Sequence, residues 1–405
     1  MLSPKTTPPG SWTRGSAGRE EDSMDLKAGA AARHEMRTLA RQLAEERVAP
    51  QALARDESRT FPREEMRLLG ACDLLGLVVS ESAGGTGADR ADFAAVAGEI
   101  AKACASTALV YVTHTIVLKA VELAAHEAVK AEWLPRLLTG ESLGAFAVHE
   151  ASSGSDTAAI ATSARREDDS YLLNGSKFLV TSGGEADLYL VLARTGATKG
   201  PQGLTALLVQ KGTPGLSFGR AEDKMGLRST SSRELFFESC RVPARNRLGD
   251  EGGGTQVIGR VAVGWGFFGA AGISVGIAQS AVDIAVKHAK ERTISGQPIA
   301  IHQAVQSLIS DMILGAEAAN ALLLACAAKA DSAPESAASN AFKAKLFASE
   351  VAVDVANKAI QVLGGHGYCR EYAVERFFRD ARGLLLHFKT SELLRQDIAK
   401  AALGL

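Results

Sequence analysis

The sequence predicts an α+β protein that is mostly helical, with one helical segment, then strands, then a second helical segment. Apolar residues recur at three- and four-residue spacing before about residue 140 and again after about residue 255. Between these positions, short apolar runs are separated by turn residues. With 405 residues, 46% of them hydrophobic, the chain can bury a sizeable core and is long enough for two or three domains.

The first helical segment extends from about residue 25 to 140. Its apolar spacing predicts helices in 36–48, 64–75, 91–104 and 117–138. The stretch "SESAGGTGAD" predicts a loop between helices, because its glycines do not follow a strand as those of a phosphate-binding loop would. Residues 1–24 are rich in Pro, Gly, Ser and Thr and lack an apolar run, so we expect a disordered tail rather than a signal peptide.

The middle segment, residues 141–255, contains runs such as "DLYLVLART" and "LTALLVQK", bounded by Asn-Gly, Gly-Gly and Pro-Gly turns. Runs of this length predict a small antiparallel β domain. Residues 256–405 return to long helices. The strongly apolar stretch "GWGFFGAAGISVGIAQSAVDIAV" predicts a buried helix, since its flanks are not those of a membrane span.

Composition argues against several classes of partner. The 45 basic and 46 acidic side chains give a net charge of -1, which offers no electrostatic basis for binding nucleic acid. Five cysteines lie far apart without the spacing of metal ligands, so no metal site is predicted. Cysteines in this odd, scattered arrangement indicate reduced thiols and a cytoplasmic protein without a membrane partner.

Several separated motifs carry a resemblance to the acyl-CoA dehydrogenase family. They are "VHEASSGSD" (148–156), "NGSKFLVTSGG" (174–184), "FFESCRVPARNRLGDEGGG", "HAKERTISGQPIAIHQAVQ" and "QVLGGHGYCREYAVERFFRDAR". The resemblance covers nearly the whole chain after the tail. It implies an N-terminal helical domain, a middle β-barrel domain and a C-terminal four-helix bundle, with FAD between the last two. It also implies a homotetramer or homodimer, because in the family a neighbouring subunit completes each FAD site.

The resemblance assigns residues around the flavin ring, whose electronics a protein tunes through hydrogen bonds. Thr181 matches a hydroxyl that reaches the flavin, although an ordinary strand threonine would look the same. His149 stands where the family usually has Thr, and Leu179 where it usually has an aromatic residue. His149 either stabilises negative charge on the reduced ring or fills space as a neutral side chain. Ser155 matches a residue at the cofactor and at the thioester-bearing arm of the substrate.

The resemblance also assigns residues to the FAD pyrophosphate, whose negative charges must be matched on burial. Glycines there let backbone N–H groups approach the phosphates closely. Glu392 replaces a neutral amide found in some relatives, so its position departs from the family pattern. The matching positions are Arg292, Gln303, Gln361, Gly364, Gly365, Thr390 and Glu392.

The catalytic carboxylate of the family has no counterpart in this sequence. The base that removes the α-proton is a Glu in a Tyr-Glu-Gly-Thr turn, and aligning "RDARGLLLHFKTSE" on that turn places Phe388 at the Glu. Relatives that carry the Glu on the first helix of the C-terminal bundle match at Gly266. A substrate-binding Asp and Arg of that helix match Gly264 and Phe267, which predicts a wider, more apolar pocket.

Three hypotheses follow from this loss. The chain is an FAD-dependent oxidoreductase acting on an acyl thioester, on CoA or a carrier protein, with His387 or Lys389 as a non-standard base. Alternatively, it is a flavin-dependent monooxygenase on the same fold, which needs no such base. In the third hypothesis it is a non-catalytic subunit of a hetero-oligomeric dehydrogenase. The first predicts an unusual substrate of specialised metabolism and either an electron-transfer flavoprotein or O₂ as acceptor.

Overall fold

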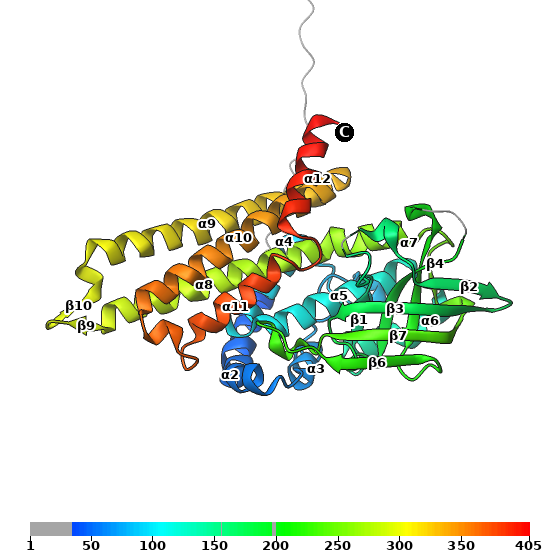
Figure 1. The fold of residues 1–405 in the computed structure, drawn as a ribbon, viewed down its shortest axis with the longest axis horizontal. Helices are drawn as coiled ribbons and strands as arrows, with labels where there is room; N and C mark the ends of the chain where they lie inside the picture. Colours follow the sequence, from blue (N-terminus) through cyan, green and yellow to red (C-terminus); the bar gives the residue numbers. More distant parts are fainter. Residues whose placement is uncertain (1–34, 155, 197–199) are drawn as a thin grey trace, which may run out of the picture.

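The computed structural model describes residues 35–154, 156–196 and 200–405. Its helices, strands and helices follow one another in the predicted order (Figure 1). The predicted tail, residues 1–24, lies outside the described residues. The N-terminal part consists of a helix over 35–43 that continues through a π-helical turn, η1 (Ala44–Val48), into α2 (Ala49–Ser58), followed by α3 (Arg63–Ala71), α4 (Arg90–Ala103), α5 (Ala105–Ala124) and α6 (Glu127–Leu138).

Helix α5 begins at Ala105, before the start of the predicted helix 117–138, and ends at Ala124, before the end of that predicted helix. The sequence "ASTALVYVTHTI" is buried on every side, so it lacks the one-sided periodicity by which a surface helix is recognised. The predicted single helix 117–138 is two helices. The imidazole of His126 accepts a hydrogen bond from the Ala128 N–H and caps α6, which separates it from α5. The predicted loop at 80–89 is confirmed between α3 and α4.

The middle part forms one eight-stranded sheet with the order β6-β7-β3-β2-β4-β5-β8, with β1 also paired to β4. Neighbouring strands are antiparallel, except that β1 and β2 each pair with β4 in parallel. Strands β4 and β5 are buried along almost their whole length. The strands are β1 (Gly144–Ala147), β2 (Ser163–Glu167), β3 (Ser170–Val180), β4 (Leu188–Arg194), β5 (Leu204–Gln210), β6 (Leu216–Ala221), β7 (Arg233–Pro243) and β8 (Arg247–Leu248).

The C-terminal part is a bundle of long helices that lies beside the sheet (Figure 1). One continuous helix starts as α7 (Gly254–Ile258), passes through a π-helical segment η7 (Gly259–Gly266) and ends as α8 (Phe267–Glu291). A short hairpin, β9 (Thr293–Ile294) and β10 (Gln297–Pro298), joins it to the next helix. The remaining helices are α9 (Gln303–Ser332), α10 (Ala337–Leu363), α11 (Ala373–Leu384) and α12 (Ser391–Leu403).

By length and composition alone, three of the described helices are apolar enough to cross a membrane: α5, the continuous helix 254–291 and α9. The structure buries 94% of the most apolar window of 254–291, which confirms the predicted buried helix. In α9 only 22% of the corresponding window is buried. The apolar face of α9 is therefore exposed in the single chain.

Glycines bring α4 and α8 into backbone contact. A Cβ atom at Gly272 would overlap the carbonyl oxygen of Ala94, and one at Gly276 would overlap that of Gly98. Because neither neighbour is a movable side chain, the separation of the two helix axes leaves no room for a methyl group. This contact joins the N-terminal helices to the bundle.

We expect Gly276→Ala to destabilise the protein by about 1–3 kcal/mol, since the methyl group forces the helices apart. Gly315→Ala on α9 is the matched control. Its Cβ would meet Val351 Cγ1 at an ordinary 3.4 Å, and alanine favours a helix by up to about 1 kcal/mol over glycine. Chemical denaturation of both variants measures the difference. Equal stability of the two would contradict the proposed close contact.

Candidate active site

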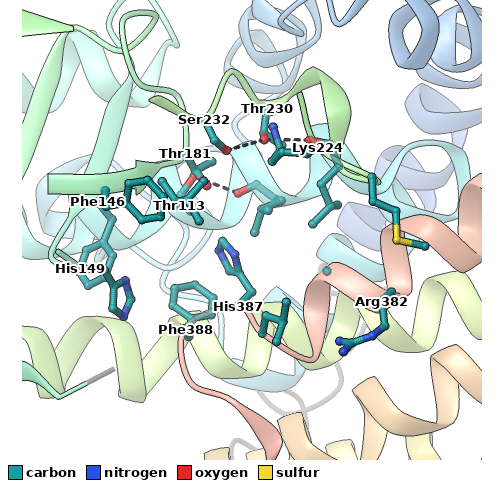
Figure 2. A pocket seen from close by; sticks show the side chains of 18 of the residues that line it. Thr113, Phe146, His149, Thr181, Lys224, Thr230, Ser232, Arg382, His387 and Phe388 are labelled. Carbon is teal, nitrogen blue, oxygen red and sulfur yellow. Dashed lines mark hydrogen bonds between the residues drawn. The ribbon is translucent and has the colours of Figure 1, made fainter. Parts of the chain in front are cut away.

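A cavity of about 600 Å³ lies between the sheet and the C-terminal helices (Figure 2). Its lining is mostly apolar with a few polar groups, as in sites that bind small molecules. Helix α5, the segment after β1, the end of β3, the 224–232 loop and the α11–α12 connection all contribute. The lining includes Leu109, Thr113, Phe146, His149, Glu150, Leu179, Thr181, Lys224, Thr230, Ser232, Arg382, His387 and Phe388.

The connection between α11 and α12 makes a strained turn at Phe388. The Lys389 N–H donates to the His387 carbonyl oxygen over 2.8 Å, and Phe388 between them has a φ of +60°. This is a γ-turn of the rare positive-φ kind. For a residue with a side chain, such a conformation costs on the order of 1–3 kcal/mol. The turn brings the Phe388 ring to the wall of the cavity (Figure 2).

The Phe388 ring packs into a row of aromatic side chains. It stacks on Phe267 with ring centroids 5.4 Å apart, and Phe267 in turn lies 5.4 Å from Phe342. Phe146 meets the Phe388 ring edge-on at 6.4 Å. These phenyl rings carry no titratable group, and the His387 imidazole meets the Phe388 ring edge-on at 4.6 Å.

The second position for a carboxylate is closed mainly by Ile116, and the Phe388 ring crowds it further. A Cβ atom at Gly266 would lie 2.6 Å from Ile116 Cδ1 and 3.2 Å from Phe388 Cζ. Neither Gly264 nor Phe267 lines the cavity, and the wider pocket expected from these positions stays a prediction. The Gly264 carbonyl accepts a hydrogen bond from Arg90 Nε at 2.8 Å, and Phe267 lies behind Phe388.

Of the two predicted bases, the structure brings only His387 to the cavity. Burial lowers the pKa of His387 to about 3, and the nearby charges of His149, Lys345 and Lys224 act in the same direction. The imidazole is therefore neutral and only weakly basic. Lys389 does not line the cavity, and its ammonium forms an ion pair with Asp397 of α12, so its role as a base stays a prediction.

The three residues predicted around the flavin ring line the same cavity. Burial lowers the pKa of His149 against the effect of a hydrogen bond to the Phe388 backbone, and the charge of Lys177 lowers it further. The neutral imidazole is thus favoured. Leu179 stands at the rim, 48% exposed and with a φ of +50°. Thr181 is buried, with its side chain at the cavity (Figure 2).

Among the described residues that line the cavity, Glu150 is the one acid, and its carboxylate is fully engaged. It accepts hydrogen bonds from Lys177 Nζ at 2.7 Å, from the Thr162 hydroxyl and from the Ala161 and Thr162 N–H groups. Burial alone would raise the pKa of Glu150, but these donors hold it below its usual value. Glu150 lies inside the motif "VHEASSGSD", but the motif alone gave no sign of this network.

Lys224 is a second residue that sequence reasoning missed. Its Nζ atom is buried in the cavity wall and has no hydrogen-bond acceptor among the described residues. Burial lowers the pKa of Lys224 to about 8, and Arg228 adds to the effect. Of the cavity side chains, this amine has a basicity suited to accepting a proton near neutral pH.

The residues predicted at the pyrophosphate lie apart from the cavity. Arg292 and Gln303 flank the β9–β10 hairpin and are exposed, as are Gln361, Gly364 and Gly365 at the end of α10. The hairpin end of α8 lies close to the glycine turn after α10, because the rings of His288 on α8 and His366 in the turn have centroids 5.7 Å apart. Thr390 and Glu392 begin α12, where the Glu392 N–H and the Thr390 hydroxyl lower the pKa of the Glu392 carboxylate. Ser155 lies outside the described residues.

The residues that are present fit FAD. The cavity is large enough for part of a cofactor, with Thr181 and His149 at its wall. Gly364 has a φ of +61°, and a Cβ added at Gly364 or Gly365 would meet no heavy atom within 4 Å. That turn leaves open space where backbone N–H groups can approach phosphates.

Lys177→Met should destabilise the protein by about 3–5 kcal/mol, because it leaves the Glu150 charge buried without its counter-ion. Lys358→Met, which breaks the more exposed Lys358–Asp354 pair on α10, is the control and should cost about 0.3–0.5 kcal/mol. Urea denaturation compares the two variants. A similar cost for both would show that Glu150 does not depend on Lys177.

Comparison with known proteins places the chain in a family. Models of the acyl-CoA dehydrogenase N-terminal, middle and C-terminal domains match residues 31–141, 145–240 and 252–403. An acyl-CoA dehydrogenase of Bacillus subtilis (strain 168) is 37% identical over 91% of this chain and 97% of its own length. The structure of butyryl-CoA dehydrogenase from Megasphaera elsdenii is similar, with 34% identity, a TM-score of 0.88 and coverage of 92% and 98%.

A third similar protein is the prolyl acyl carrier protein oxidase AnaB, at 29% identity, with a TM-score of 0.86 and coverage of 92% of this chain and 99% of AnaB. The three family models together extend over most of the chain, in the order that the fold shows. They confirm the predicted fold class and the resemblance. The chain belongs to the acyl-CoA dehydrogenase family.

Proposed function

We propose that the chain oxidises an acyl thioester at bound FAD without a carboxylate base at either family position. As a member of its family it is an FAD-dependent oxidoreductase acting on acyl-CoA. The observation that supports the finer proposal is the Phe388 ring, which fills one Glu position and, together with Ile116, crowds the other at Gly266. The lining acid Glu150 is engaged by Lys177 and cannot substitute.

The chemistry assigns separate tasks to FAD and to the chain. Bound FAD supplies the acceptor for the two electrons that leave the acyl group. The chain must take up the α-proton, and we propose Lys224 for this task, since its buried amine has no hydrogen-bond acceptor among the described residues and has a pKa of about 8. Neutral His149 and the Thr181 hydroxyl are the groups we assign to the flavin ring.

The proposal extends to the partners. AnaB is described as an oxidase of a carrier protein substrate, which supports an acyl carrier protein as an alternative to CoA, with O₂ or an electron-transfer flavoprotein as acceptor. We also propose a role in specialised metabolism and a cytoplasmic location.

Exposed apolar residues on α9, among them Leu314 at 63% and Leu324 at 42%, support a homodimer or homotetramer. Sedimentation equilibrium of the purified chain distinguishes these states from a monomer.

An anaerobic titration of the FAD-loaded protein with a panel of acyl thioesters, followed by flavin absorbance, tests the reaction. We expect wild type to lose its visible band with at least one thioester, and Phe388→Leu, which keeps an apolar side chain, to do so with the same one. Phe388→Glu restores a carboxylate at the family position. Bleaching of Phe388→Glu alone would contradict the proposal and favour oxygen chemistry or service to a partner subunit.

The role of Lys224 predicts a pH dependence. Because the neutral amine accepts the proton, the rate of flavin reduction should rise with pH and level off above the Lys224 pKa of about 8. Lys224→Met should lower the plateau rate by about 10²–10⁴-fold. Stopped-flow absorbance from pH 6 to 10 measures both effects, with Arg382→Met at the same cavity as control. A rate in Lys224→Met equal to that of wild type would exclude the lysine.

A further inference from the structure

Lys345 is a fully buried lysine on α10 that neither the family comparison nor the cavity lining assigns. It lies on the helix face of Ala341, Ala348 and Ala352, which are all buried. Its Nζ atom donates hydrogen bonds to the carbonyl oxygens of Leu385, at 3.1 Å, and Lys389, at 2.8 Å. Burying an ammonium group costs free energy unless its N–H groups donate hydrogen bonds, and these two carbonyl oxygens accept such bonds.

The two acceptors stand on either side of the strained turn. Leu385 precedes the γ-turn of 387–389 and Lys389 closes it. One ammonium from α10 therefore ties both arms of the turn to the bundle. Burial lowers the pKa of Lys345 to about 8, so the side chain is still protonated at neutral pH and keeps its donors.

The positive φ of Phe388 requires such an external restraint. A strained backbone conformation persists only when its surroundings fix it. Within the turn, the described backbone hydrogen bonds of 386 and 387 both reach back to Gly383, and the 389-to-387 bond spans only Phe388. The bonds from Lys345 link the turn to a helix distant in sequence.

We propose that Lys345 is a positioning residue, whose buried ammonium holds the γ-turn and thereby fixes the Phe388 ring against the cavity. Lys345 does not touch the reacting atoms. It acts through the backbone of 385–389, and the part of the claim that concerns ligand binding depends on the function proposed above.

Hydrogen exchange of the FAD-loaded protein, read by mass spectrometry, tests the clamp. Lys345→Met keeps the length of the side chain and removes its donors, and Lys343→Met changes an exposed lysine on the same helix. We expect amide exchange in 385–390 to rise about tenfold or more in Lys345→Met, while α8 and the rest of α10 exchange as in wild type. Unchanged exchange in 385–390, or an equal rise throughout α8 and α10, would overturn the proposal.

Relief of the strain provides a second test. Phe388→Gly removes the penalty of positive φ, so the turn depends less on its restraint. Lys345→Met should raise the unfolding equilibrium constant in both backgrounds. The factor of increase should be smaller by about fivefold or more in the Phe388→Gly background than in wild type. An equal factor of increase in the two backgrounds would contradict the role of Lys345 as a clamp. If Lys345→Met does not accumulate as folded protein, Lys345→Gln, which keeps one donor group, enters the same cycle with the same criteria.

A third test measures the affinity for an acyl-CoA from the change in flavin absorbance at equilibrium. Lys345→Met should weaken the affinity, whereas Lys343→Met should not. Unaltered affinity in Lys345→Met would overturn the link between the clamp and the cavity. If no thioester perturbs the flavin of wild type, the proposed function fails, and the exchange and coupling results still decide the role of Lys345.

Discussion

The γ-turn at Phe388 is the constraint on which the cavity depends. A side chain at positive φ projects in a direction that neither helix nor strand would give it, and here that direction leads to the junction of sheet and bundle. The aromatic row behind Phe388 and the hydrogen bond from the His149 ring to its backbone both rely on this geometry. A relaxed turn would move the ring and unpack Phe146 and Phe267 together.

The two family positions for the carboxylate are neighbours in space, since an added Cβ at Gly266 would meet the Phe388 ring at 3.2 Å. Ile116 Cδ1 lies closer still to that Cβ, at 2.6 Å. A return of Glu to position 266 would therefore require room beside Ile116 as well as beside Phe388. The cavity retains one carboxylate, Glu150, which is held by Lys177, and its other polar groups are imidazoles, hydroxyls, guanidinium groups and an amine.

The sequence sufficed for the order of elements, which depends on local patterns, whereas the residues expected at the flavin followed from the resemblance to the family. Strands such as β4 and the buried helix 254–291 follow from apolar runs, and His149, Leu179 and Thr181 lie in short motifs. Side-chain direction at a turn depends on backbone strain that no pattern reports, so the ion pair of Lys389 with Asp397 could not be predicted. Lys345 left a signal, since it interrupts the alanine face of α10, but its acceptors are 40 and 44 residues away in sequence. Lys224 left none.

The backbone contact between α4 and α8 bears on how rigid the helical framework is. Helices that meet glycine against carbonyl cannot slide or separate without losing that fit, so the helical framework is poorly suited to breathing motions. Neither helix lines the cavity, which is bordered on facing sides by the 224–232 loop and the segment between α11 and α12. The rigid contact thus joins two parts of the fold without entering the candidate site.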